Sequence, residues 1–149
     1  MQMSIGVKFI LLEKIRGTIN LLKKSNVSNE LVVNGKTVLS LLKELQRLVR
    51  HNESNCLNES AILLPYLHIL GSKTISGPYV RNSIEALQAF LTGSLLASLP
   101  YQRISEALRN IVLAIINCKF IHTDLSGDEL VQLHMVETLR CILNCSVSY

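Results

Sequence analysis

Aliphatic side chains recur every three or four residues along almost the whole chain, and this period constrains the fold more than any other feature. It matches one face of an α-helix, whereas β-branched residues nowhere alternate with polar ones over the length of a strand. We therefore predict an all-α fold of about six amphipathic helices. The first two predicted core stripes are Ile5, Phe9, Leu12, Ile15, Ile19 and Leu22, and Val38, Leu41, Leu42, Leu45, Leu48 and Val49.

Glycine and proline divide the rest of the chain into four further helices. A third helix is expected over about 60–71, where Pro65 is tolerable only near the first turn and Gly-Ser at 71–72 ends the helix. Pro78 and Pro100 each suit the first turn of the next helix. The sixth helix is predicted over about 127–145. The inward residues are expected to be Val80, Ile84, Leu87, Leu91 and Leu95, then Ile104, Leu108, Ile111, Ile115 and Cys118, then Val131, Met135, Leu139 and Ile142.

The six predicted helices fall into three successive pairs joined by short breaks. This arrangement favours an armadillo/HEAT-like α-solenoid, with a helical bundle as the alternative. A length of 149 residues suits one domain, and no break is long enough for a domain linker, so we expect a single helical domain over residues 1–149. The polar loop at 50–60 is expected to be mobile.

Charge and hydropathy narrow the classes of function. Residues 1–60 carry nine Lys/Arg against five Glu, but the basic residues are interspersed with Glu and aromatics are only 5%, which argues against nucleic-acid binding. No secretion signal or membrane span is visible, so we expect a cytoplasmic protein whose four cysteines are reduced. A basic first helix that carries Phe, Ile and Leu leaves a peripheral membrane-binding domain as the alternative function.

The segment CKFIHTDLSGDELVQLH, residues 118–134, gathers most of the polar chemistry. With Ser126 as the N-cap, Glu129 stands three residues later, which predicts a capping box, and Leu125 and Leu130 occupy the positions of a hydrophobic staple. Asp128 and Glu129 would lie in the first turn, where the helix dipole favours negative charge. The segment is thus predicted to be the start of a helix.

Other chemistries fit the same segment less well. Its glycine is misplaced for a calcium loop. A zinc site from Cys118, His122, Cys141 and Cys145 has suitable spacing, but the three cysteines are also plausible packing positions. A cysteine–histidine hydrolase would need a spatial arrangement that spacing cannot supply, and no phosphate loop or dinucleotide motif occurs. We expect no enzyme activity, no catalytic residue, no cofactor and no bound metal.

Three stretches resemble a known family. LLPYLHIL, SKTISGPYVRNSIEALQAFL and AIINCKFIHTDLSGDELVQLHMVETLRCIL are similar to the N-terminal dimerisation and cyclophilin-binding (DCB) domain of the large Arf guanine-nucleotide exchange factors, in particular the Golgi brefeldin-A-resistance class. The similarity covers about 36–143. The residues that carry it are Pro65, Tyr66, Gly77, Pro78, Phe90, Leu91, Phe120, Thr123, Asp124, Asp128 and Glu129.

The resemblance implies a non-catalytic regulatory module in Golgi vesicle traffic, truncated relative to the family's domain. It implies a homodimer, contacts with downstream helical domains of the exchange factor, an immunophilin as a further partner, and a location peripheral to Golgi membranes. Exchange activity is not implied, because the family's catalytic glutamate belongs to a separate domain. The resemblance suggests Phe90, Asp128 and Glu129 as interaction residues, although Ala89 stands where relatives can carry a basic residue.

Overall fold

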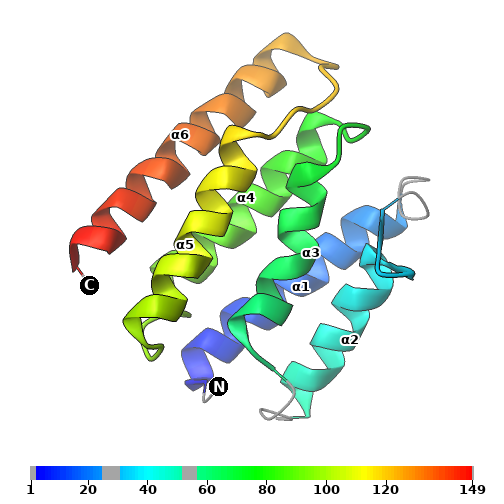
Figure 1. Ribbon diagram of the computed structural model, residues 1–149. Coiled ribbons are helices and arrows are strands. Elements are labelled where there is room, and N and C mark those ends of the chain that lie inside the picture. The colour runs from blue at the N-terminus through cyan, green and yellow to red at the C-terminus, as the bar shows by residue number, and fades with distance from the viewer. Residues whose placement is uncertain (1–2, 25–30, 52–56, 149) are drawn as a thin grey trace.

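The computed structural model describes residues 3–24, 31–51 and 57–148, with side chains described to residue 144. Within these ranges the chain forms six α-helices, which confirms the all-α prediction (Figure 1). They are α1 (Ile5–Lys23), α2 (Val38–Arg50), α3 (Glu59–Gly71), α4 (Gly77–Thr92), α5 (Tyr101–Ile116) and α6 (Leu125–Ser148). None of them combines the length and apolar character that crossing a bilayer requires. The loop expected to be mobile lies largely outside the described residues.

The helices pack in two layers. α1, α4 and α6 lie side by side in one layer, and α2, α3 and α5 in the other, with α1 on α2, α3 on α4 and α5 on α6 across the layers (Figure 1). In the first pair the chain therefore enters through the layer of α4 and α6, whereas each of the next two pairs begins in the other layer. Successive pairs are stacked, and the armadillo/HEAT-like solenoid remains a prediction, with the bundle as its alternative.

A short hairpin precedes α2, contrary to the expectation of no strand. β1 (Val32–Val33) pairs antiparallel with β2 (Lys36–Thr37), and Val32 lies opposite Thr37. Asn34 and Gly35 form the turn with φ values of 51° and 80°, a conformation that Asn and Gly adopt more readily than other residues. The strands are too short to produce an alternating pattern, so only Asn-Gly signalled the hairpin.

The core stripe of α1 differs from the predicted one. Ile15, Ile19 and Leu22 are buried as expected, but Leu11 and Thr18 complete the buried face, whereas Ile5 and Phe9 point to solvent with 89% and 68% of their surface exposed. Assigning Ile5 and Phe9 to the core was wrong. The predicted and observed stripes share their later members and diverge only toward the N-terminus.

A proline lies in the middle of α3. Pro65 is buried and lies well inside the helix, so its expected restriction to the first turn was wrong. Proline has no N–H, and the carbonyl of Ala61 therefore lacks its usual donor four residues later. Burial of the neighbouring apolar residues holds the helix together despite this lost hydrogen bond.

Polar contacts cross the helix interfaces in two places. The Thr18 hydroxyl oxygen of α1 lies 3.3 Å from the hydroxyl of Tyr66 in α3 and 2.8 Å from Oδ1 of Asn82 in α4. Between α5 and α3, the Arg103 guanidinium binds both carboxylate oxygens of the buried Glu59, with Nε 2.7 Å from Oε1. These contacts fix how neighbouring helices sit on α3.

Candidate functional site at the start of α6

Asp124, rather than Ser126, caps α6. The backbone N–H of Gly127 donates to Oδ2 of Asp124 over 3.0 Å, and the Ser126 hydroxyl contacts the same oxygen at 3.3 Å. In return, the backbone N–H of Asp124 donates to Oδ2 of Asp128 over 3.3 Å. This is a reciprocal cap built from two aspartates, so the predicted capping box of Ser126 and Glu129 was wrong.

The shift has a physical reason. A carboxylate accepts hydrogen bonds from helix N–H groups and adds negative charge that the helix dipole favours. Asp124 and Asp128 place carboxylates shortly before Ser126 and Glu129, the two residues of the predicted capping box. Leu125 consequently becomes the first residue of α6 and is exposed, so it cannot form the predicted hydrophobic staple with Leu130. Glu129 is also exposed and takes no part in the cap.

Asp128 lies at the centre of this helix start and is buried, although the resemblance had suggested it as an interaction residue. Its Oδ2 lies 3.3 Å from Nδ1 of His122, whose ring packs on Phe120 with the ring centroids 4.7 Å apart. A Cβ placed on Gly77 would lie only 3.0 Å from Oδ1 of Asp128. Asp128 therefore holds α6 close to the first turn of α4 rather than facing a partner.

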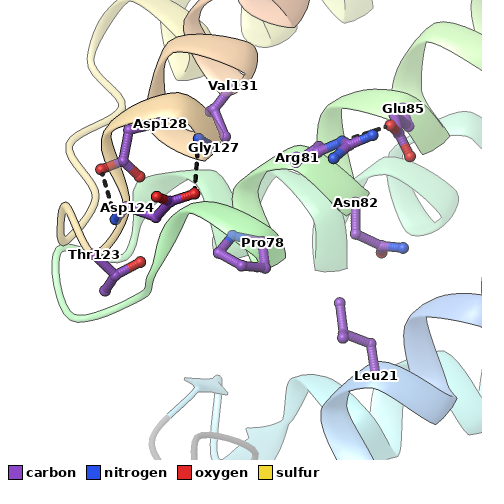
Figure 2. A pocket seen from close by; sticks show the side chains of 10 residues that line it. All are labelled: Leu21, Pro78, Arg81, Asn82, Glu85, Thr123, Asp124, Gly127, Asp128 and Val131. Carbon is purple, nitrogen blue, oxygen red and sulfur yellow. Dashed lines mark hydrogen bonds and ion pairs between the residues drawn. The ribbon is translucent and has the colours of Figure 1, made fainter.

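A cavity of about 300 Å³ lies between the end of α1, the first half of α4 and the start of α6 (Figure 2). The charged groups on its wall already have partners. Arg81 Nε contacts Oε1 of Glu85 at 3.0 Å, and Asp128 accepts from Asp124 as described. The cavity could accept a small polar group, but its charged side chains are already engaged within α4 and within the start of α6. The lining residues are Leu21, Pro78, Arg81, Asn82, Glu85, Thr123, Asp124, Gly127, Asp128 and Val131.

Phe90, the third suggested interaction residue, belongs to the core. Only 2% of its surface is exposed, and its ring meets that of Tyr66 edge to face with the centroids 5.4 Å apart. Its assignment to an interaction surface was wrong, because a side chain enclosed between α3 and α4 cannot touch a partner unless the helices separate. Of the three suggested residues, only Glu129 is exposed.

The zinc alternative can be examined for part of its ligand set. Burial raises the pKa of the Cys118 thiol to about 11, so in the absence of a metal ion this side chain is protonated at neutral pH. Among the side chains that the structure describes, no three of His, Cys, Asp or Glu gather as a metal site would require. The side chain of Cys145, like Cys56, lies outside the described residues.

The outward face of α6 carries a surface that the periodicity did not single out. Leu133 and Val136 expose 53% and 62% of their surface, and the exposed Glu129 and Arg140 flank them. The inward prediction for the same helix holds for Val131 and Ile142, which are buried, whereas Met135 and Leu139 are half-buried. Apolar residues beyond the inward stripe were the signal for a second face.

The chain matches no model in a scan of known protein families. Its relation to the Arf exchange factors is therefore a proposal.

Proposed function

We propose that the chain is a non-catalytic interaction and regulatory module of an Arf guanine-nucleotide exchange factor, of the DCB type, that acts in Golgi vesicle traffic. Its central activity is self-association. The observation that carries this proposal is the outward face of α6, whose exposed residues are complementary to a second copy of themselves. The resemblance in the Pro65–Tyr66 and Phe120–Thr123 segments supplies the family.

Symmetry makes the complementarity specific. Leu133 and Val136 lie equally far on either side of the midpoint between His134 and Met135, and Glu129 and Arg140 do so as well. When two α6 helices pack antiparallel about a two-fold axis at that midpoint, each residue lies opposite its counterpart from the other copy. Leu133 then faces Val136 of the second copy, and Glu129 faces Arg140 twice.

The apolar contacts and the ion pairs both favour pairing of the two α6 helices. Burying a Leu or Val side chain contributes roughly 1.5–3 kcal/mol when burial is complete, and the symmetric interface would cover two such residues on each copy. The two Glu129–Arg140 contacts add little affinity at an exposed rim, but they select the antiparallel register and oppose a parallel one. An interface in which each copy uses the same patch is the commonest arrangement in homodimers.

Other partners belong to the same proposal. Downstream helical domains of the exchange factor, or an immunophilin, could use the exposed apolar positions of α5 and α6, which include Leu113, Ile116 and Leu125. Phe90 would contribute only as a core residue. Association with Golgi membranes would then be peripheral.

Size-exclusion chromatography with light scattering tests the proposal, using two charge reversals. We expect the parent chain to dimerise at micromolar concentration, and Glu129→Arg and Arg140→Glu each to weaken the dimer, because each places like charges opposite one another. An equimolar mixture of the two variants should dimerise again. In the mixed dimer, position 129 of each variant faces an opposite charge at position 140 of the other. The double variant should also regain the parent's behaviour.

The two levels of the proposal fail differently. A parent chain that remains monomeric at every concentration and salt tested would contradict self-association. A parent dimer whose mixed variants do not recover would leave self-association standing and contradict the α6 register. Helicity of each variant, measured by circular dichroism, controls for misfolding.

A further inference from the structure

The first helix has a second, solvent-facing stripe in addition to its core face. Ile5, Phe9, Leu12, Arg16 and Lys23 are separated by four, three, four and seven residues, so they share one side of α1. We call these five residues the α1 outer stripe. Ile5 and Phe9 are largely exposed, Leu12 is half-buried, and Arg16 and Lys23 are exposed. Leu12 packs partly against the core, but the core does not require Ile5 or Phe9, because other residues of α1 supply its buried face.

The stripe changes character along its length. Its first half is apolar, whereas its second half carries Arg16 and Lys23, neither of which forms an ion pair with another described residue. Glu13 is the single acid of α1, against Lys8, Lys14, Arg16 and Lys23. Apolar side chains next to basic ones that no described acid neutralises suit a surface that offers both hydrocarbon and negative charge.

The position of α1 leaves the stripe accessible. α1 lies at one end of its layer, and its main packing partners are α2 and α4 (Figure 1). A helix held on the protein by its buried face can lie flat on a second surface with its opposite side. A helix in a bilayer interface adopts this orientation, with apolar residues inserted and Lys/Arg at the headgroups.

We propose that the α1 outer stripe binds an anionic lipid surface, with Ile5 and Phe9 inserted among the acyl chains and Arg16 and Lys23 at the phosphates. A protein groove could bury the same apolar pair. Arg16 and Lys23, which form no ion pair with any residue that the structure describes, favour a lipid surface, because each basic residue near an anionic membrane adds to the attraction. This inference is independent of α6 pairing.

Vesicle sedimentation with the full 149-residue chain tests it. Vesicles of phosphatidylcholine with phosphatidylserine should bind the parent chain, and vesicles of phosphatidylcholine alone should bind it much less. Ile5→Ser with Phe9→Ser should lower the partition coefficient on anionic vesicles by at least about tenfold, because two large apolar side chains no longer insert. Arg16→Ala with Lys23→Ala should lower it by roughly tenfold at low salt and by less at high salt, where the charges are screened.

The matched control replaces an exposed apolar pair elsewhere. Leu113→Ser with Ile116→Ser on α5 removes the same kind of surface without touching α1 and should leave vesicle binding unchanged. Unfolding midpoints of all variants should match the parent's, since none of the four apolar residues is buried. The lipid assignment is overturned if the parent does not sediment with anionic vesicles, if neutral vesicles bind it equally, or if the α1 and α5 variants lose binding alike.

Discussion

The Thr18 hydroxyl oxygen and Oδ1 of Asn82 lie 2.8 Å apart, although 64 residues separate them in the sequence. The same hydroxyl lies 3.3 Å from that of Tyr66, whose pKa is raised by burial. Thr18, itself buried, thus joins α1 to both helices of the second pair. A buried polar group in such a place stabilises the fold only while its partners remain.

Removing the Thr18 hydroxyl should therefore destabilise the protein. Thr18→Val keeps the shape of the side chain and leaves the Tyr66 hydroxyl and Asn82 without this partner, at a cost of about 1–3 kcal/mol in the free energy of unfolding. Urea unfolding followed by circular dichroism measures the change. The double variant Thr18→Val with Tyr66→Phe removes the orphaned hydroxyl too, so it should be less destabilised than the sum of the single variants. Simple additivity would contradict the coupling.

The cap of α6 predicts a difference between two neighbouring residues. Asp124→Ala should lower the free energy of unfolding by about 1 kcal/mol, since the N–H of Gly127 loses its acceptor. Ser126→Ala should change it by much less, because Ser126 only contacts the capping carboxylate. Asp124→Asn retains the acceptor and serves as the control. Equal effects of the two alanine variants would restore Ser126 as the cap.

Gly77 of α4 lies close to the first turns of α6. A methyl group there would meet Asp128 Oδ1 at 3.0 Å and Val131 Cγ2 at 3.4 Å, so Gly77→Ala should destabilise the protein by about 1–3 kcal/mol through overpacking. The matched control is Gly71→Ala at the end of α3, where no described atom lies within 4 Å of the added methyl group. That variant should be neutral or slightly more stable. Thermal unfolding of the two variants separates packing from helix propensity.

The thiol of Cys118 should react slowly at neutral pH. Because burial raises its pKa to about 11 from an ordinary value of 9.0, little of the reactive thiolate is present at neutral pH. Alkylation by iodoacetamide, followed at the Cys118 peptide by mass spectrometry, should be slower than that of glutathione at pH 8. The folded state also holds this proton more tightly than the unfolded state, so the contribution of Cys118 to stability should fall as pH rises from about 9 to about 11. Labelling as fast as that of glutathione would contradict the shift.

The regular helices could be predicted because periodicity reports burial directly. All the predicted inward residues of α4 are buried, although Leu95 lies in the turn after the helix, and Ile104, Leu108, Ile111 and Ile115 of α5 are buried too. α1 shows the limit of the method. The predicted core stripe and the observed buried face share Ile15, Ile19 and Leu22. Apolar character alone, however, also assigns Ile5 and Phe9 to the core. The true core face includes Thr18, whose burial depends on partners from α3 and α4 that the local sequence cannot reveal.

The sequence predicted a helix start at the candidate site but not the residues that cap it. Residues 118–134 do build a helix start, but several side chains there could cap it, and only the structure shows that Asp124 and Asp128 are close enough to exchange hydrogen bonds. Gly77 approaches this turn from a distant part of the chain, and that contact accounts for the burial of Asp128. Tertiary contacts of this kind decide between caps that the sequence permits equally.

The position of α3 and α4 in the two layers has a consequence for folding. These two helices pack on one another, and each also contacts a neighbour on either side, whereas the main packing partners of α1 and α2 do not include α5 or α6. The ends of the molecule can therefore open separately, while the middle pair cannot open without releasing both. We expect amide hydrogens of α3 and α4 to be the last to exchange with deuterium, and the middle pair to form the folding nucleus on which the two ends assemble.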